Sequence, residues 1–463
     1  MKGLEASILR LSAVGDLNPG LRFDAEFFSR PAMMALKEIR RARHDPLRDL
    51  CKKIQHPIEV VREYEDEGLL TVMAKNVRSN RAEMSDPRFM PSQLRSVVAR
   101  NKLNRNDVLV TRTGANFGQA SPWKQDFEAF ACADILVLRE PSIPSGYLSS
   151  FLECAKGKPL VLRGGYGAGQ PHIAPPYLAD MLIPRFGALE GRVDAVIDRS
   201  VQMEVEAAST VQAAEQVLLA ALGLANWTPP EPLAYTARAC EVFASGRFDA
   251  QYFRPLFAEV ADRLQATGGS VELGTILSVN ARGRQPQYDE TGLPVINSKH
   301  VRTHHVILED NRTATESGSP VIIETGDVLL NGTGVGTIGR TAPYLHQKRA
   351  LPDNHVTVLR TDAIDPVYLS VFLNSPLGQW QIERHIKGSS GQIELYPTDI
   401  ARIMIWDAPD TVQQSVRAAI LSAFDEERRA NELLEAAKRA VEIAIEDGEP
   451  AAMAYLDQVE RAT

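Results

Sequence analysis

Cysteines and long hydrophobic runs are both scarce in this sequence. Its 463 residues include four cysteines, Cys51, Cys132, Cys154 and Cys240, and none of them forms a CxxC pair. We therefore expect reduced thiols rather than disulfides, a metal site or a catalytic thiol. No apolar run approaches the roughly 18 residues of a membrane span, and residues 1–10 lack the apolar core of a signal peptide. These absences predict a cytoplasmic protein that does not bind a membrane.

A surplus of positive charge is missing as well. The net charge of −8 by itself argues against a nucleic-acid-binding protein. However, acidic residues concentrate in two long helical stretches, 189–222 and 412–446, whereas the first β-rich region is basic on balance. Because attraction to DNA depends on the local face rather than on the chain total, the objection weakens for the first half. It remains for the second half, which is roughly neutral.

No catalytic constellation recurs in the sequence. We find neither a Ser/His/Asp set nor a pair of acids in both halves. Residues 334–339 (GVGTIG) fit the G-x-G-x-x-G of dinucleotide sites, but the sequence after them is poor at opening a helix, so we expect a tight β-turn. Residues 174–177 (APPY) resemble the loop in which amino-methyltransferases hold a target amine, yet Ala174 lacks the required side-chain oxygen. Nothing here indicates an enzyme.

Two further groups of residues are interpreted without a catalytic or metal role. His300, His304 and His305 include the i, i+4 spacing that ligates metals on a helix, but they lie in a β-rich segment. We expect a solvated or phosphate-facing cluster instead. Asp107 and Asp327 each precede a strand, and we expect them to be turn residues.

What the sequence does contain is an internal repeat. The heptapeptide RFDAEFF at 22–28 returns as RFDAQYF at 247–253, with a proline close behind each copy. Further segments recur in the same order, about 220 residues apart. The matched segments are 75–78 with 299–302, 107–114 with 327–334, 134–139 with 355–360, 147–152 with 368–373, and 178–183 with 400–405. A nearly constant spacing over so many segments predicts a duplicated architecture.

The repeat and the hydrophobic patterns together predict an α+β protein with two tandem pseudo-repeats. In the first long helix, Val193, Ile197, Val201, Val205 and Ala208 follow three- and four-residue steps, which suits a coiled-coil seam. The aromatic residues of the two heptapeptides are expected to pack the first helix of each repeat rather than to touch a ligand. The predicted parts are a first β-rich unit at 1–186, a long helix at 187–224, a linker at 225–246, a second β-rich unit at 247–408, a second long helix at 409–446 and an acidic tail at 447–463.

Polar residues near the recurring turns are the candidate binding residues. Lys and Arg supply phosphate contacts, and Arg and Gln also read guanine and adenine edges. Isolated residues of this kind are mostly ordinary surface, but four pairs recur in both halves: Lys75 with Lys299, Arg78 with Arg302, Thr113 with Thr333 and Gln170 with Gln392. Arg139 and Arg360 recur too, but their place at strand ends fits a structural role. The predicted DNA-binding set is Lys75, Arg78, Lys102, Arg105, Arg112, Thr113, Gln170, Lys299, Arg302, His304, Asn331, Thr333, Arg340 and Gln392, with no catalytic or metal-binding residue.

The order of these segments resembles the specificity subunit of Type I restriction–modification systems, from about Arg22 to Glu446. The resemblance implies that each β-rich unit is a target recognition domain for one half of a bipartite DNA site. It also implies that the two long helices pair antiparallel as a spacer and dock two methyltransferase subunits. Those partners would carry S-adenosylmethionine and the adenine-N6 chemistry, and a translocating nuclease subunit would complete the restriction complex. This chain would itself hold no cofactor.

Three points bear on that resemblance. A helix of roughly 34 residues spans about 50 Å, more than the roughly 34–36 Å of one DNA turn, so helix length is expected to set the distance between the half-sites. The long linker and the low net charge also fit a relative in another methylation-based defence system. The alternative hypothesis is a duplicated β-domain scaffold for protein interactions that does not touch DNA, which salt-dependent DNA binding would separate from the first. An autonomous methyltransferase or nuclease is disfavoured because cofactor and metal motifs are missing.

Overall fold

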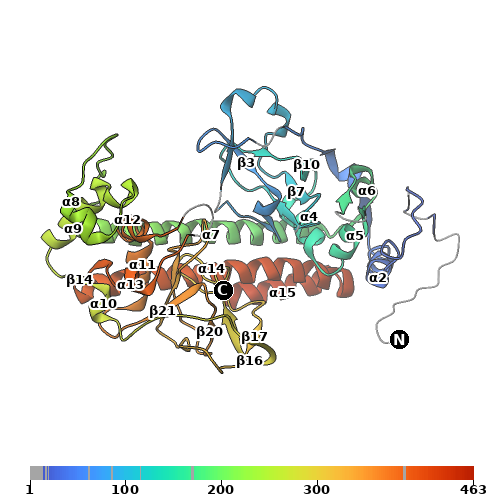
Figure 1. The fold of residues 1–463 in the computed structure, drawn as a ribbon. Coiled ribbons are helices and arrows are strands. Elements are labelled where there is room, and N and C mark those ends of the chain that lie inside the picture. Colours follow the sequence, from blue (N-terminus) through green and yellow to red (C-terminus); the bar gives the residue numbers. More distant parts are fainter. Residues whose placement is uncertain are drawn as a thin grey trace. The chain divides into compact units, whose positions relative to one another are not determined.

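The computed structural model describes residues 14–15, 18, 20–60, 63–84, 87–114, 116–167, 171–388 and 393–462. The protein is a mixture of helices and strands, as predicted, and its chain divides into two compact units (Figure 1). Unit 1 comprises Met1–Val205 and Glu426–Thr463, and unit 2 comprises Glu206–Asp425. Both divisions fall inside the longest helices, α7 (Gly187–Ala221) and α14 (Asp410–Asp447), so each unit holds one part of each helix. The boundaries predicted between β-rich regions and helices stay a prediction.

A four-stranded antiparallel sheet forms the centre of unit 1. Its strand order is β2 (Cys51–Gln55), β10 (Ile135–Pro141), β7 (Val108–Thr111) and β8 (Ala120–Pro122). All of β7 and the first five residues of β10 are buried, so these strands are continuous apolar runs without polar alternation. A second sheet places β3 (Leu69–Val72) between an antiparallel β6 (Arg88–Met90) and a parallel β9 (Phe130–Ala131). The short strands β1 (His44–Pro46) and β13 (Leu182–Pro184), β4 (Val77–Arg78) and β5 (Arg81–Ala82), and β11 (Gly165–Tyr166) and β12 (His172–Ile173) form pairs.

Helices complete the core of unit 1. They are α2 (Arg30–Ile39), α3 (Leu47–Leu50), α4 (Ser145–Glu153), α5 (Lys158–Arg163), α6 (Pro175–Ala179) and α15 (Glu449–Ala462). The predicted first helix begins only at Arg30, where Pro31 takes an early position that suits its fixed φ. The segment predicted as an acidic tail contains α15, and its Ala452 and Leu456 are buried in the same core as α4 and α7.

Unit 2 repeats the strand order and pairing directions of unit 1. Its four-stranded sheet is β15 (Val279–Arg282), β21 (Val356–Arg360), β18 (Val328–Asn331) and β19 (Thr341–Pro343). Its second sheet places β16 (Tyr288–Ile296) between an antiparallel β17 (Thr313–Ala314) and a parallel β20 (Leu351–Pro352). The pair β14 (Ser270–Glu272) with β22 (Met404–Trp406) corresponds to β1 with β13. The helices are α8 (Ala239–Ser245), α9 (Pro255–Ala266), α10 (Leu273–Ile276), α11 (Pro366–Asn374), α12 (Pro376–His385) and α13 (Pro397–Ile400).

The repeated heptapeptide folds into a clamp at the start of each unit. In unit 1 the Arg22 guanidinium donates two hydrogen bonds to the Asp24 carboxylate, both at 2.7 Å, and Asp24 Oδ1 accepts from the Phe27 backbone N–H at 3.0 Å. Arg247, Asp249 and Tyr252 make the same set of bonds in unit 2. The predicted packing role is confirmed for the buried Phe27 and Phe28. It is wrong for the second residue of each copy, because Phe23 and Phe248 are each 74% exposed.

Within each unit, one part of α7 packs against one part of α14. In unit 1 the residues in contact include Val193 and Ile197 of α7 and Leu433 and Leu434 of α14, and Ser200 Oγ donates to Ala430 O at 2.9 Å. In unit 2, Ala214 and Leu218 share a core with Val416 and Ile420. The predicted seam is wrong in its middle, because Val205 is 58% exposed and the buried positions there are Met203 and Ala207. No described helix is long and apolar enough to cross a membrane.

Candidate nucleic-acid interface

A glycine-rich turn leaves the central sheet at the same place in both units. In unit 1 it joins β7 to β8 and contains Gly114 (φ +89°) and Gly118 (φ +76°). In unit 2 it joins β18 to β19 and contains Gly334 (φ +95°), Gly336 (φ +79°) and Gly339 (φ +80°). Residues with a Cβ atom rarely adopt these positive φ values, which explains why glycine occupies these positions. The β-turn prediction for 334–339 is confirmed, because strand β19 rather than a helix follows.

In unit 1 three predicted cations lie around this turn. The Arg78 guanidinium donates to Asn116 Oδ1 at 3.2 Å, and Asn116 Nδ2 donates to Ala74 O at 3.2 Å, next to the exposed Lys75. Arg112 opens the turn, with its Nη1 3.1 Å from His56 Nε2. Turn, lysine and arginines therefore form one polar region of unit 1, in which the Arg78 Nε also pairs with Glu83 at 3.2 Å.

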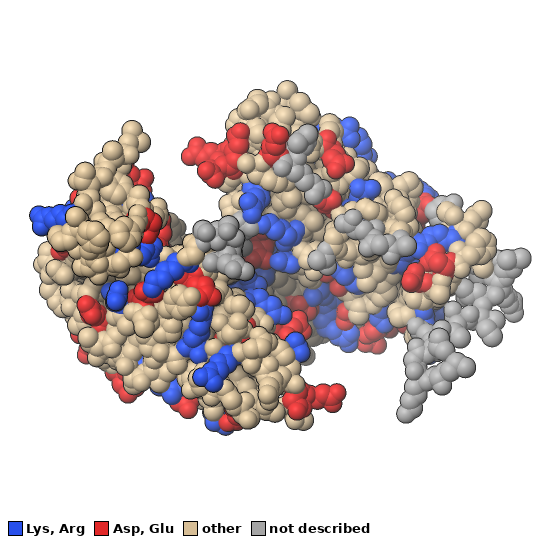
Figure 2. All heavy atoms as spheres, in the orientation of Figure 1, with Lys and Arg blue, Asp and Glu red and all other residues tan. Residues whose placement is uncertain are grey.

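In unit 2 Arg302 and Arg340 lie close enough to influence each other. Burial and the charge of Arg302 together lower the pKa of Arg340, whose Nη2 donates to Gly336 O at 3.1 Å. Thr333 Oγ1 lies 2.7 Å from His355 Nδ1, and Lys299 is exposed. On the face shown in Figure 2, several Lys and Arg side chains gather over the strands of unit 2, with acidic side chains among them. An anion placed beside the two arginines would relieve their repulsion.

The remaining predicted residues all stay predictions, and of these Thr113 and Asn331 lie at the start of the turns. Lys102 and Arg105 are exposed and form ion pairs with Glu128 and Asp126 at 3.1 and 3.0 Å. Three others are buried and bonded inside their own unit. These are Thr113, which donates to Asp134 at 2.9 Å, Asn331, which donates to Ser298 O at 3.1 Å, and His304, whose Nδ1 is 3.2 Å from Asn374 Nδ2 and whose Nε2 is 3.5 Å from Glu215 Oε1. Gln170 and Gln392 lie outside the described residues.

Sequence comparison missed a group of residues beside the unit 2 turn. Arg282, at the end of β15, donates from Nη2 to Gly332 O at 3.1 Å. Its guanidinium lies 5.7 Å from the Tyr396 ring, and Lys387 Nζ lies 5.5 Å from the same ring. Tyr396 is 40% exposed, while Arg282 pairs with Glu394 at 3.7 Å and Lys387 pairs with Asp399 at 2.7 Å. A partly exposed ring beside two cations suits stacking or phosphate contact.

Arg112 and Arg282 occupy equivalent places although they belong to different strands. Arg112 and Gly332 each follow the last residue of the equivalent strands β7 and β18, and their neighbours across the sheet are His56 and Arg282. A Cβ added to Gly332 would lie 3.0 Å from Arg282 Nη2, so in unit 2 the guanidinium takes up room that a side chain at 332 would need. Each unit thus sets one guanidinium at the strand end before its glycine turn. Aligning the two halves of the sequence does not show this equivalence, because the aligned positions carry different residues. The strand registers show it.

The two aspartates before the strands anchor a buried ion pair in each unit. Asp107, 1% exposed, binds Arg139, and Asp327, also 1% exposed, binds Arg360 at 2.6 and 2.8 Å. Each carboxylate also accepts a backbone N–H three residues before it, from Asn104 or Glu324, at 2.8 Å. The turn role is thereby confirmed, and the predicted structural role of both arginines fits these contacts.

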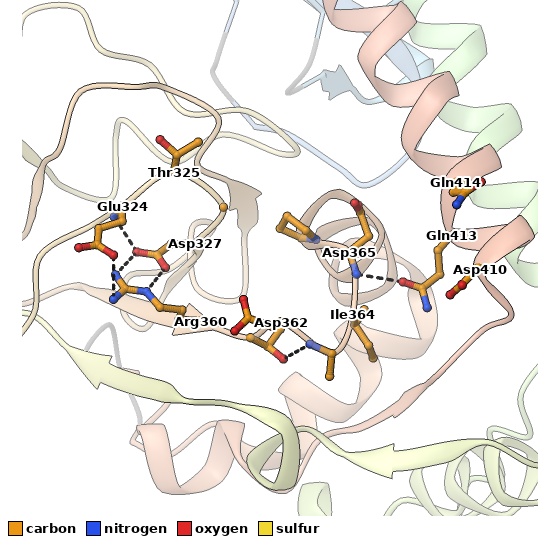
Figure 3. A pocket seen from close by; sticks show the side chains of 14 residues that line it. Glu324, Thr325, Asp327, Arg360, Asp362, Ile364, Asp365, Asp410, Gln413 and Gln414 are labelled. Atoms are coloured by element: carbon orange, nitrogen blue, oxygen red, sulfur yellow. Dashed lines mark hydrogen bonds and ion pairs between the residues drawn. The ribbon is translucent and has the colours of Figure 1, made fainter.

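A hollow of about 620 Å³ lies beside the second ion pair in unit 2 (Figure 3). Figure 3 shows Arg360 held between Glu324 and Asp327 on one side, and Asp365, Gln413 and Asp410 on the other. Asp365 N donates to Gln413 Oε1 at 2.9 Å, which ties α11 to α14. Because carboxylates dominate its lining, this hollow would repel DNA, and the interface is better placed at the glycine turn.

The other sequence alternatives find structural explanations. His300 and His304 are buried, so the expectation of a solvated cluster is wrong for them, and burial lowers the pKa of His300 to about 4. Among the described residues no group of three or more His, Cys, Asp or Glu side chains could hold a metal ion. In the 174–177 segment, the Tyr177 hydroxyl donates to Leu160 O at 2.5 Å and its ring lies 6.1 Å from that of Phe27. That segment therefore packs α6 into unit 1.

Comparison with solved structures gives distant likenesses, of which three are described. The chain is similar to Type I specificity subunits. Those found are the Type I restriction–modification S subunit from M. genitalium (TM-score 0.36, 10% identity, 90% of this chain and 95% of that one), the HsdS subunit from Thermoanaerobacter tengcongensis (0.26, 15%, 86% and 96%) and a chain from a study of assembly and conformational transition of the type I R-M system (0.29, 14%, 90% and 97%). No family model and no curated protein matches the chain.

Proposed function

We propose that this chain is a sequence-specific DNA-binding specificity subunit that reads a bipartite target and directs adenine-N6 methyltransferase subunits to it. The observation that carries the proposal is the recurrence of a glycine turn with a guanidinium at the strand end in front of it, once in each unit. Each of the two units presents one turn with cations. Two such turns suit the two half-sites of a duplex DNA target, because cations bind phosphates and arginine also reads guanine. The order of sequence segments, which resembles Type I specificity subunits, agrees with this function.

The long helices supply the second part of the proposal. We infer an antiparallel coiled coil from the packing of α7 against α14 inside each unit. Helices of 35 and 38 residues reach about 50 Å at 1.5 Å per residue, enough to bridge half-sites one DNA turn or more apart. The same helices would dock two methyltransferase subunits, which carry S-adenosylmethionine, while this chain performs no chemistry. A restriction subunit would join the complex where the system cleaves DNA, and the assembly would work in the cytoplasm.

Salt-dependent binding to duplex DNA tests the function. The full chain, in the assembly in which it purifies, is titrated with a random-sequence duplex and with a duplex selected from a random library, at several salt concentrations. We expect the logarithm of the affinity to fall linearly with the logarithm of salt, with a slope of about −0.9 per phosphate contacted. A protein-interaction scaffold gives no such binding, and that result would reject the proposal.

A matched pair of variants locates the contact. Arg78→Ala combined with Lys75→Ala should reduce the salt slope by about two, because both cations lie at the unit 1 turn. Arg48→Ala combined with Lys52→Ala is the control that removes the same charge, since both residues are exposed in the same unit but pair with Asp180 and Glu140. An equal loss in both variants would show that total charge matters and the turn does not.

A further inference from the structure

Val335 is an aliphatic side chain held out into solvent at the tip of the unit 2 glycine turn. It is 71% exposed and lies between Gly334 and Gly336, both at positive φ. The glycines on either side leave its two methyl groups free of neighbouring side chains. A β-branched side chain also has few rotamers, so its position is well defined.

The turn below Val335 is a rigid frame. Gly334 O accepts from Thr337 N at 3.1 Å and from Ile338 N at 2.9 Å, and Gly339 N donates to Asn331 O at 2.8 Å. The Thr337 hydroxyl donates to Thr333 O at 3.0 Å. A tip supported in this way is preorganised and loses little freedom when it binds.

Arginines lie around the base of the turn, with one acidic side chain among them, because Arg282 Nη1 is 3.7 Å from Glu394 Oε2. Arg340 bonds to Gly336 O beside it, Arg302 is close to Arg340, and Arg282 bonds to Gly332 O at the base of the same turn. The turn caps the two antiparallel strands β18 and β19. A two-stranded β-ribbon fits the major groove of B-DNA, roughly 12 Å wide, but not the minor groove of roughly 6 Å. The cations would meet the phosphates at the groove edges while the tip faces the bases.

We propose that Val335 determines specificity by contacting the C5-methyl group of a thymine in the half-site that unit 2 reads, an inference that rests on the proposed DNA-binding function. The thymine methyl is an apolar group on the base edges of the major groove, and apolar side chains contact it. The Val335 side chain has no hydrogen-bond donor, so its own contact with DNA would be apolar rather than to a phosphate.

Uracil substitution tests this directly, because uracil is thymine without the C5-methyl group. The probe is the duplex selected by the full chain from a random library, together with each of its single thymine-to-uracil versions. The wild type should lose about fourfold in affinity at one thymine, the effect of one buried methyl group. Val335→Ala should bind the thymine duplex more weakly and show no further loss with uracil, whereas Val335→Ile should keep the uracil penalty. Val97→Ala, which alters an exposed valine of unit 1, should also keep it.

The outcomes separate the inference from the function. Salt-dependent duplex binding with no uracil penalty at any thymine, a selected half-site without thymine, or an undiminished penalty in Val335→Ala would each overturn the role of Val335 and leave the proposed function standing. Absence of duplex binding by the wild type would overturn both.

Discussion

At the scale of single residues, the equivalent ion pairs of the two units differ in burial. The Arg139 side chain is 8% exposed, whereas that of Arg360 is 29% exposed and also pairs with Glu324 at 3.1 Å. An unpaired buried carboxylate is costly because no water replaces its partner. The same contact should therefore matter more in unit 1 than in unit 2.

Replacing either arginine with alanine tests this difference. Arg139→Ala should lower the free energy of unfolding by about 3–5 kcal/mol. Arg360→Ala should lower it less, since water reaches Asp327 through the adjoining hollow. Hydrogen exchange is measured at increasing urea concentrations. The amides of β10 report the free energy of unfolding of unit 1, and those of β21 report that of unit 2. Equal losses would contradict the role assigned to burial.

Two buried histidines predict an acid-sensitive unit 2. Burial lowers the pKa of both His300 and His385 to about 4, so each stays neutral in the folded chain at pH values where the unfolded chain protonates it. The unfolded state then binds more protons between about pH 6.5 and pH 4, and stability falls as the pH drops through that window, by up to about 1.4 kcal/mol per pH unit for each histidine. Above pH 6.5 neither residue contributes a slope.

Unfolding free energies measured across this window check the prediction. The double variant His300→Gln, His385→Gln should show a shallower loss between pH 6.5 and pH 4, whatever its stability at neutral pH. His44→Gln is the control, because His44 belongs to unit 1 and is partly exposed. An unchanged slope in the double variant would exclude these histidines as the cause.

At the scale of elements, the strand end before the glycine turn accepts a guanidinium from either of two strands. This equivalence predicts that the arginine can be moved. Arg112→Gly should weaken duplex binding by about tenfold, roughly 1.4 kcal/mol, because it removes the guanidinium from the unit 1 turn. Adding His56→Arg should restore most of the loss, since the new side chain then has the room that Arg282 has beside Gly332.

Affinity measured by fluorescence anisotropy for wild type, single and double variants checks the exchange. His56→Arg alone serves as the control for added charge. If the double variant binds no better than Arg112→Gly, the two arginines are not equivalent.

Sequence patterns predicted the elements better than they predicted the interface. The central strands β7, β10, β18 and β21, the glycine turns and the long helices follow from hydrophobic runs and glycine positions that each segment carries by itself. Strands β2, β8, β15 and β19 were not predicted. Arg282, Lys387 and Tyr396 were missed because strand pairing and loop packing, not sequence distance, bring them to the turn. The predicted helix seam was wrong at Val205 for a related reason. Neighbouring elements decide which face of α7 is buried, and at this point they cover Met203 and Ala207.

At the scale of the whole molecule, α7 and α14 each pass from one unit into the other. If their length sets the spacing of the half-sites, shortening both should shorten the spacer of the recognised sequence. Removing seven residues from each helix where the units divide keeps the heptad phase and shortens the pair by about 10 Å. That corresponds to about three base pairs at roughly 3.4 Å each.

Methylome sequencing of cells carrying the shortened chain measures the spacer. We expect two unchanged half-sites separated by about three fewer base pairs. Deleting seven residues from the linker at 225–246 is the control and should leave the spacer unchanged. An unchanged spacer in the shortened-helix variant would contradict the hypothesis that helix length sets the distance between the half-sites.

The division of the chain has a consequence for synthesis on the ribosome. Unit 2 is one continuous segment, Glu206–Asp425, and every residue of it has been made before α14 is finished. Unit 1 is split, because its core needs Leu433, Ala437 and Leu456 from the last part of the chain. The segment Met1–Val205 is translated first, and its apolar surface therefore stays uncovered until Glu426–Thr463 has been made. Its early exposure makes unit 1 the part most dependent on chaperones during translation, and a premature stop after Asp425 would leave unit 2 with all of its residues while unit 1 lacked part of its core.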